Sequence, residues 1–399
     1  MAHSVTVTSS SSWFSRLAQS AKSVLVGLVF FFVSFPLLFW NEGRAVRTAK
    51  SLAEGAGAVV SVGADRVDSG NEGKLVHVSG AVTTDGPVVD EALGVEAEGV
   101  KLVRNVEIYQ WKEKESSETR KKLGGGSETV TTYTYDTIWS EETIDSTSFH
   151  DESGHENRGD MPLGSTTFEA DGVHLEAFEL SPEQIAALDE KEPLQVDGPP
   201  TADLAGDPRG ALRAADGGFY LGADPTSPQV GDVRIRFEVV RPTTVSVVGV
   251  QVGNSFAAYQ AEAGDSVLLV DEGTHTAAEM FQAAQDANKI LTWVLRVVGW
   301  LLMFFGLLLI FKPIAVFADV LPLLGNMLGA GLGIFSFFIA SGLTLVTIAI
   351  AWLAYRPLLG ISLLVLAGGA IFLLARRGRK AAPAAAPPPP PPLPPLPSV

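Results

Sequence analysis

The stretch Ser23–Trp40 reads SVLVGLVFFFVSFPLLFW and contains no charged residue. A transmembrane helix needs about 20 predominantly apolar residues, so this run predicts a membrane span near the N-terminus. The residues at its end, Phe39–Glu42 (FWNE), lack the small-residue pattern of a signal-peptide cleavage site. We therefore expect an uncleaved signal anchor.

Three more apolar runs lie near the other end of the chain, at Trp293–Phe311, Met327–Ala354 and Leu358–Ala375. The second of them is long enough to cross a bilayer with tilt. The third is short but carries no charge. The sequence thus predicts one N-terminal and three C-terminal membrane helices.

The acidic residues are concentrated in one block between these runs. Of the 45 Asp and Glu residues, 44 lie between Glu42 and Asp286, and the remaining one is Asp319. Residues 41–292 carry a net charge of −24. This layout is typical of a multi-pass membrane protein with one large water-exposed domain, and a domain this acidic is not expected to bind nucleic acid.

Basic residues flank the predicted spans on one side of the membrane. Such flanks usually stay in the cytoplasm, so the acidic block is expected to face the periplasm, the outside of the cell or a lumen. The flanking residues are Arg16, Lys22, Lys312, Arg376, Arg377, Arg379 and Lys380.

The predicted fold is an α+β membrane protein with four transmembrane helices and a large β-rich extracytoplasmic domain between helices one and two. The predicted parts are a cytoplasmic N-terminal tail (1–22), helix one (23–40), the acidic domain (41–292), helix two (293–311), a cytoplasmic or interfacial loop (312–326), helix three (327–354), helix four (358–375) and a basic, then proline-rich cytoplasmic tail (376–399).

Alternating apolar and polar residues predict strands in the acidic domain. The charged segment Lys112–Glu128 is expected to be a long hairpin connection, and residues 1–12 a mobile polar tail. Because the chain has no cysteine, the domain must be held together by its core. The predicted strands are Gly73–Val82, Leu102–Trp111, Thr129–Trp139, Asp232–Val240, Thr244–Val252 and Ser266–Val270.

Helices are predicted at three further places in the acidic domain. Ala45–Glu54 has charges at helical spacing directly after the first span, and Ser181–Leu188 opens with Ser, Pro and Glu. Thr276–Lys289 is amphipathic and leads into the second span. The first of these is expected either at the membrane surface or as the root of the soluble domain.

Polar residues gather where three predicted spans reach the outer interface. A charge inside a span usually needs a partner or a water path, and Glu42 is the nearest carboxylate to Arg296. One interpretation is ion pairing that fixes helix positions; the other is a lipid site whose arginines hold phosphate. The candidate lipid- or partner-binding residues are Asn41, Glu42, Arg44, Arg296, Tyr355 and Arg356.

Catalytic chemistry is not indicated by the sequence. A Ser-nucleophile elbow, a phosphate-binding glycine loop and a dinucleotide fingerprint are all missing. The loop His150–Glu156 holds two histidines and three acids, a pattern more typical of a solvated loop than of a metal site. We therefore predict no catalytic residue, metal or cofactor, and an enzyme is the less favoured class.

Several stretches, in order along the chain, resemble the LUMA family, also called the transmembrane protein 43 family. The resemblance covers about residues 23–375. The stretches are Asn41–Gly55 (NEGRAVRTAKSLAEG), Asn71–Ala81 (NEGKLVHVSGA), Tyr109–Glu113 (YQWKE), Tyr133-x-Tyr135 with Trp139, Gly154-His155, Val230–Phe237 (VGDVRIRF), Thr292–Trp300 (TWVLRVVGW) and Leu343–Leu358 (LTLVTIAIAWLAYRPL).

The resemblance implies a four-span protein with its soluble domain in a lumen. Eukaryotic members lie in the endoplasmic reticulum and inner nuclear membrane, self-associate, and are tied to lamins, emerin and nuclear-envelope organisation. The family brings no established catalytic residues. The proline-rich tail and the Ala/Gly-rich, cysteine-free composition depart from it and favour a bacterial member.

The expected function is that of a membrane organiser or scaffold that self-associates and meets membrane lipids and unknown protein partners. The alternative is a lipid-binding or lipid-processing protein that uses the polar cluster at the outer interface. The expected location is a bacterial inner (plasma) membrane with a periplasmic domain, or the endoplasmic reticulum and inner nuclear membrane of a eukaryote.

Overall fold

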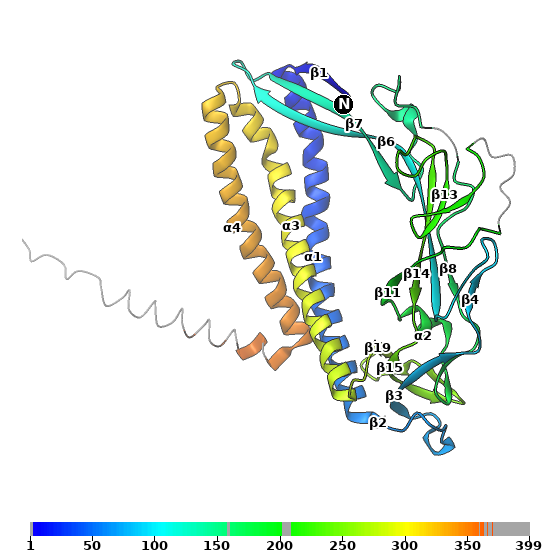
Figure 1. Ribbon diagram of the computed structural model, residues 1–399. Coiled ribbons are helices and arrows are strands. Elements are labelled where there is room, and N and C mark those ends of the chain that lie inside the picture. Colours follow the sequence, from blue (N-terminus) through cyan, green and yellow to red (C-terminus); the bar gives the residue numbers. More distant parts are fainter. Residues whose placement is uncertain are drawn as a thin grey trace, which may run out of the picture.

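Three long helices lie side by side in the computed structural model (Figure 1). The structure describes residues 3–157, 160–201, 209–358, 360–362, 365 and 369. The helices are α1 (Trp13–Ala58), α3 (Ala277–Ala318) and α4 (Pro322–Tyr355), and each is long and apolar enough to cross a membrane. The predicted fourth span (358–375) lies largely outside the described residues, and residues 376–399 lie wholly outside them.

Two of these helices continue well beyond the predicted spans. The predicted helix Ala45–Glu54 is part of α1, which runs on from the apolar run to Ala58 without interruption. Helix α3 starts inside the acidic domain, where Thr276 and Glu279 form a capping box. The apolar runs and the roots of the domain are therefore single rigid helices.

The predicted loop 312–326 is much shorter in the structure. Helix α3 passes through Pro313 to Ala318, and α4 begins with Pro322 at its first turn. Proline fits the first turn of a helix because its missing N–H would be unpaired there anyway. Only residues 319–321 connect the two helices.

The β-rich domain contains an eight-stranded sheet in the order β1-β7-β6-β14-β13-β12, with β11 beside β14 and β8 beside β6. All its pairings are antiparallel. Its strands are β1 (His3–Ser11), β6 (Lys101–Lys121), β7 (Ser127–Ser140), β8 (Thr166–Glu169), β11 (Lys191–Leu194), β12 (Arg213–Ala215), β13 (Gly218–Leu221) and β14 (Val233–Val240).

A seven-stranded sheet lies nearer the root of the domain. Its order is β10-β9-β3-β15-β16, with β19 beside β15 and β2 beside β3. Its strands are β2 (Val60–Ser61), β3 (Leu75–Thr84), β9 (Val173–Leu175), β10 (Phe178–Glu179), β15 (Thr244–Val252), β16 (Ser255–Ala257) and β19 (Leu269–Glu272).

Short elements complete the domain. Two separate pairs join β4 to β5 and β17 to β18. These elements are β4 (Val88–Asp90), β5 (Val95–Ala97), β17 (Tyr259–Gln260), β18 (Ser266–Val267), the helix α2 (Pro182–Ala186) and the 3-10 turns Ser69–Asn71 and Ser146–Ser148.

Two segments differ from the prediction. The N-terminal segment expected to be mobile forms β1, which pairs along its whole length with β7. The charged segment expected to be a loop continues β6 to Lys121, which leaves only residues 122–126 as the hairpin tip. Threonine is a strong strand former, and the threonines of β7 stabilise both additions across the strands.

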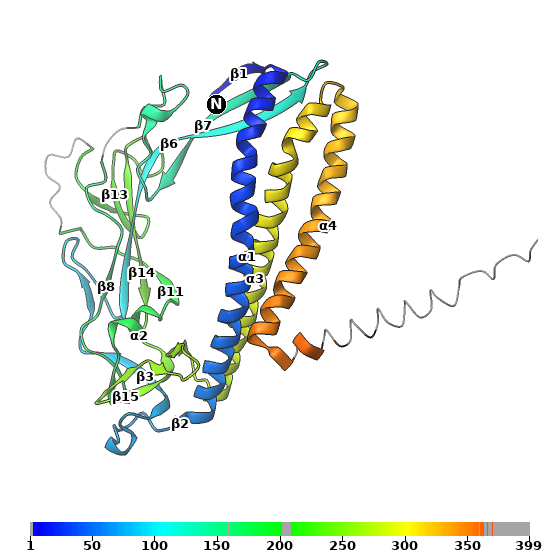
Figure 2. The same cartoon turned by 180° about the vertical axis from the view of Figure 1, so that it is seen from behind.

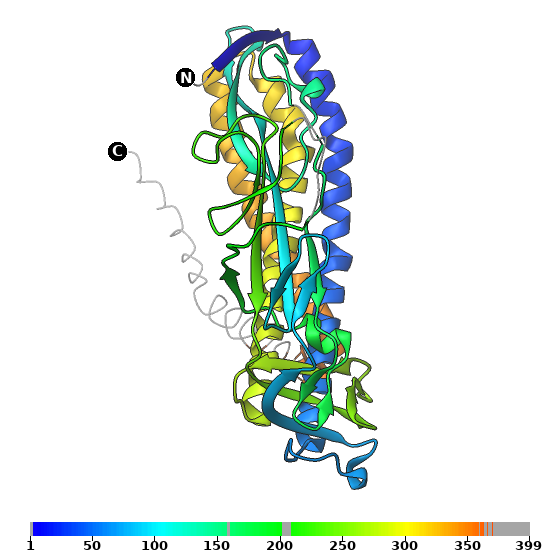
Figure 3. The ribbon, with the colours of Figure 1, turned by 45° about the vertical axis from the view of Figure 1, so that its right-hand side comes forward.

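The apolar core divides between the domain and the helices. Between the sheets lies a large cluster that includes Val76, Leu102, Phe178 and Phe237. A separate cluster joins α1, α3 and α4 around Leu38 and Met303. Seen from behind, the domain lies beside the helices and meets them near both ends (Figure 2), and the molecule is elongated along the helices (Figure 3).

Candidate functional site

Polar residues join α1 to α3 just beyond the apolar run of α1. The buried Asn41 donates its amide hydrogen to the carbonyl oxygen of Thr292 over 3.0 Å. One turn further on, the side chain of Asn288 donates to the carbonyl oxygen of Ala45 over 3.0 Å. These bonds fix the register of two adjacent helices, because each amide matches one backbone carbonyl of its neighbour.

An ion pair between Glu42 and Arg296 lies next to these amides. The two guanidinium nitrogens Nε and Nη2 of Arg296 meet the two carboxylate oxygens of Glu42 at 2.6 and 2.9 Å. Glu42 is fully buried and the Arg296 side chain is 14% exposed. Such a two-pronged arrangement has the strongest geometry for a guanidinium and a carboxylate.

Helix α4 joins the same carboxylate. Trp352 donates its indole N–H to Glu42 over 2.8 Å, so one carboxylate connects three helices. The Arg296 guanidinium also lies over the rings of Trp293 and Trp352, at 4.8 and 5.9 Å from their centroids. The protein itself thus supplies Arg296 with a carboxylate and two aromatic rings.

Arg44 differs from Arg296 because all its hydrogen-bond partners are neutral. Its guanidinium donates to the side-chain oxygens of Asn288 (2.9 Å), Thr292 (3.0 Å) and Asn41 (3.3 Å). Burial lowers the pKa of Arg44 below its ordinary value, and the more distant Asp265 and Glu42 partly offset this effect. Arginine stays protonated in proteins, so this site carries a positive charge that no adjacent carboxylate neutralises.

The last two predicted site residues lie at the end of α4, beside this cluster. A Cβ on Gly43 would come within 2.7 Å of the Tyr355 ring, so glycine allows α4 to approach α1 here. Tyr355 also contacts Phe39, with ring centroids 5.2 Å apart. Arg356 is half-buried at the C-cap of α4 and takes no part in the hydrogen bonds described around Glu42.

The structure therefore brings four predicted residues, Asn41, Glu42, Arg44 and Arg296, into one polar cluster. Three further residues that were not predicted from the sequence complete the cluster: Asn288, Thr292 and Trp352. A signal for two of them was present, because Asn288, Thr292 and Arg296 recur every fourth residue and share one helix face. Nothing in the sequence linked Trp352 to a carboxylate more than 300 residues away.

A second polar cluster lies at the opposite end of the helices, around the buried Asp319. Arg16 of α1 forms an ion pair with this carboxylate, and Lys121 at the end of β6 reaches it over 2.7 Å. Lys121 also donates to Asn326 of α4 over 2.9 Å. The one acid outside the acidic block thus ties the β6–β7 hairpin to all three helices.

Close backbone approach at the hairpin tip supports this second cluster. Gly125 has a φ of +81°, and a Cβ there would lie 2.3 Å from the Trp13 ring. Trp13 in turn donates its indole N–H to the carbonyl oxygen of Val316 over 3.0 Å. These contacts place part of the acidic block against segments that the topology prediction put on the other side of the membrane.

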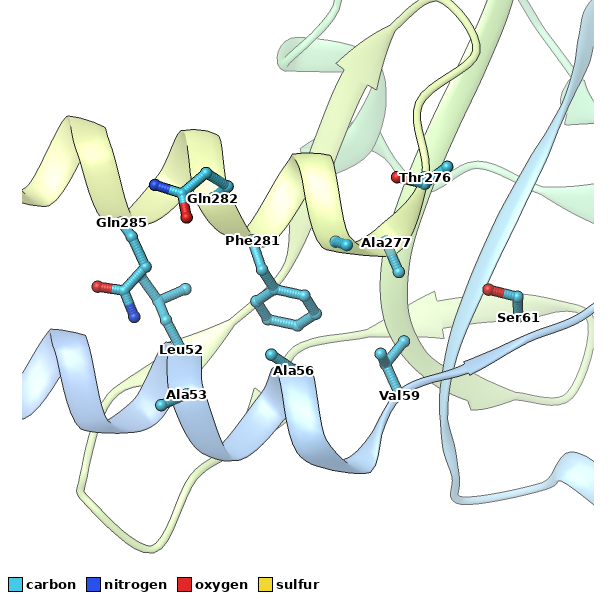
Figure 4. Close-up of a pocket in the computed structure, with 11 residues that line it drawn as sticks. Leu52, Ala53, Ala56, Val59, Ser61, Thr276, Ala277, Phe281, Gln282 and Gln285 are labelled. Atoms are coloured by element: carbon cyan, nitrogen blue, oxygen red, sulfur yellow. The ribbon is translucent and has the colours of Figure 1, made fainter.

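The root of the domain holds a cavity of about 550 Å³ between α1, α3 and β2 (Figure 4). Phe281 of α3 points towards α1 in this cavity, where Gly55 leaves room for its ring. The polar groups around it are Ser61, Thr276, Gln282 and Gln285, and no charged side chain lines it. The cavity therefore offers apolar volume without groups for acid–base or metal chemistry.

Comparisons with known proteins place the chain in one family. The model of the family described as Transmembrane protein 43 matches residues 108–357. Transmembrane protein 43 of Rattus norvegicus is 37% identical over 86% of this chain and 87% of its own length, and the Homo sapiens protein is 35% identical over the same shares. The Drosophila melanogaster homolog is 31% identical over 87% of this chain and 92% of its own length.

No solved structure matches the chain. The relatives named above are animal proteins, so the bacterial origin favoured by composition stays a prediction. With the apolar helices, these matches indicate an integral multi-pass membrane protein. The chain belongs to the transmembrane protein 43 family.

Proposed function

We propose that the protein is a membrane organiser that self-associates through α4 and presents its acidic domain to partners. The observation that carries this proposal is an uncovered glycine pair on α4. Gly329 and Gly333 are one turn apart, and a Cβ on either would meet no described atom within 4 Å. Small residues at this spacing let membrane helices pack closely against each other.

The rigid connection between helices and domain suits such a role. Because α1 and α3 run without interruption from the apolar runs into the domain, association of the helices would fix the relative positions of the attached domains. With a net charge of −24 on residues 41–292, the domain favours partners that carry basic surfaces.

The organiser proposal is tested by the oligomeric state of the full chain in nanodiscs. The Gly329→Leu/Gly333→Leu double variant should be monomeric where the wild type is oligomeric, because two leucines would prevent close helix contact. Gly342→Leu is the matched control. It lies nine residues from Gly333 and hence on the opposite helix face, and its position is equally open.

Subunit counting by single-molecule photobleaching gives the readout. A wild type that is monomeric, or a double variant that keeps the wild-type stoichiometry, would rule out association through this face of α4. Loss of the oligomer in Gly342→Leu as well would show that any leucine on α4 disrupts the assembly, and it would also count against the proposed face.

Lipid binding is the second candidate function. Glu42 and Arg296 neutralise each other in a close ion pair, so this pair gives the weaker support for a head-group site. Arg44, with its neutral partners, does favour it.

For the location, we propose the inner (plasma) membrane with a periplasmic domain if the source is bacterial, and the endoplasmic reticulum or inner nuclear membrane if it is eukaryotic.

A further inference from the structure

A basic pocket of about 510 Å³ lies between α1, the end of α4 and the segment before β18. It is separate from the Glu42–Arg296 ion pair and from the cavity at the root of the domain. Three cations, two aromatic rings and small residues line it. The ones that matter here are Trp40, Arg44, Arg47, Lys50, Ala263 and Tyr355.

The charge of this pocket is opposite to that of the molecule. Arg44, Arg47 and Lys50 follow each other at intervals of three on α1, which places them on one face of the helix. No carboxylate is among the residues that line the pocket, although the chain has a net charge of −16. A concave surface lined by one sign of charge concentrates ligands of the opposite sign.

None of the three cations is held in a buried ion pair in the described structure. Arg44 has only neutral hydrogen-bond partners. Arg47 meets Asp265 over 3.2 Å, but both side chains of this pair are at least 30% exposed, so the pair is weak. Lys50 is exposed at the rim. Because Arg47 and Lys50 are exposed, turning towards an anion would break no buried contact of either side chain.

The position of the pocket decides the kind of anion. It begins where the apolar run of α1 ends, and the exposed Trp40 and Tyr355 beside it are residues typical of the membrane–water interface. Towards the apolar middle of the helices, α1 and α4 expose apolar side chains such as Val33 and Ile350. A ligand with a phosphate at this depth and acyl chains beneath it would contact both surfaces.

We propose that this pocket binds the head group of an anionic phospholipid, with the phosphate held by Arg44, Arg47 and Lys50 and the acyl chains lying along α1 and α4. This inference rests on the second candidate function, lipid binding, and deepens it by naming the class of lipid and its site; it does not depend on self-association. Free phosphate shares the head-group chemistry but lacks the acyl chains, so the two can be told apart.

The test measures lipid retained by the full chain. Protein reconstituted in vesicles of phosphatidylcholine with phosphatidylserine is extracted in mild detergent, and native mass spectrometry counts the bound phosphatidylserine. Lys50→Gln should lower its affinity about fivefold, the effect of one basic residue near an anionic surface. Ala354→Trp, which fills the pocket without changing charge, should also lower it.

Lys289→Gln is the matched control, because it removes an exposed lysine from α3 close to the same interface but outside the pocket. It should retain lipid like the wild type. Equal retention in Lys50→Gln and the wild type, or equal loss in Lys50→Gln and Lys289→Gln, would overturn the proposal. All variants are compared after a thermal melt shows that they are folded.

A competition arm separates the two sources of phosphate. Inorganic phosphate added to the loaded wild type should leave the phosphatidylserine in place, because the free ion cannot replace the acyl-chain contacts. Displacement of the lipid by inorganic phosphate at millimolar concentration would show a site for free anions and would contradict the lipid assignment.

Discussion

At the scale of single residues, Glu42 and Arg296 show how a charge is held inside a membrane helix. Taking two charges out of water is costly, and the cost is offset only where the geometry is good and the remaining polar atoms are bonded. The two contacts of Arg296 and the indole of Trp352 meet both conditions. This pair therefore holds the helices together. Removing one partner would leave the other as an uncompensated buried charge.

Replacing one partner should be strongly destabilising. Arg296→Gln leaves the Glu42 carboxylate buried without its counter-charge, which costs about 3–5 kcal/mol. Thermal unfolding in detergent, followed by circular dichroism, should show a clearly lowered midpoint. The control is Lys289→Gln, whose exposed pair with Asp286 should contribute little to stability because solvent screens it. If both variants unfold at the same temperature, the ion pair does not hold the helices together.

The sequence was sufficient to predict the proximity of Glu42 and Arg296, because an isolated charge in an apolar run demands a partner. It did not reveal that Trp352 would donate a further hydrogen bond to Glu42. Nor did it reveal that Arg44 would donate to neutral side chains. Those outcomes depend on the rotation of three helices about their axes, which local sequence does not specify. The separation of Arg356 from the cluster follows from the same rotation.

At the scale of elements, close packing of α1 on α3 depends on glycine. A Cβ on Gly27 would lie 2.7 Å from the carbonyl oxygen of Gly306, and one on Gly306 would lie 2.8 Å from the backbone nitrogen of Phe31. Backbone atoms cannot turn away as a side chain can. The two helices would have to separate to accommodate either methyl group.

Gly27→Ala should therefore lower stability, by about 1–3 kcal/mol as is usual for overpacking. Gly57→Ala serves as the control on the same helix, because a Cβ there meets no described atom within 4 Å and alanine is the better helix former. The thermal midpoints of the two variants in detergent give the comparison. A Gly27→Ala variant as stable as Gly57→Ala would mean that the helices are not in close contact at this point.

Element boundaries were predictable where local signals are strong. The amphipathic pattern of Thr276–Lys289 and the alternation of Asp232–Val240 predicted the start of α3 and strand β14 correctly, and the predicted strand Thr244–Val252 coincides with β15. The hairpin of β6 and β7 was predicted too short, because charged residues on both faces of a strand resemble a loop. Strand β1 could not be foreseen, since its partner β7 lies more than a hundred residues away.

At the scale of the whole molecule, the hairpin and a bilayer compete for the same space. The domain is rooted at one end of the helices, while its hairpin reaches Asp319 at the other end (Figure 1). If a bilayer surrounds the apolar middle of the helices, the charged strand between those ends would have to lie in hydrocarbon. Charged residues there cost about 2.5–3.5 kcal/mol each. We therefore expect the hairpin to move away from the ends of the helices when the protein lies in a membrane.

Two engineered cysteines test this expectation in a chain that has none of its own. Lys121→Cys and Asn326→Cys replace residues whose side chains are in contact, so a bismaleimide cross-link between the two thiols should form in the detergent-solubilised protein. It should not form in sealed membranes, where the predicted topology puts the two positions on opposite sides. Mobility on non-reducing gels gives the readout. A cross-link in sealed membranes would show that residues 41–292 and 312–326 do not lie on opposite sides.

The contacts around Asp319 also bear on the order in which segments of the chain insert and pair during synthesis. Arg16 and Asp319 are 303 residues apart in the sequence. Strand β1 can pair only after β7 has been synthesised, and at a few to twenty residues per second this takes roughly ten seconds. By then the first apolar run has left the ribosome and is ready for insertion. During that interval β1 has no partner, and its serines and threonines, with only two valines, keep an unpaired strand soluble. Insertion of α1 therefore precedes any pairing of β1, and in a membrane that separates β1 from β7 the strand stays unpaired.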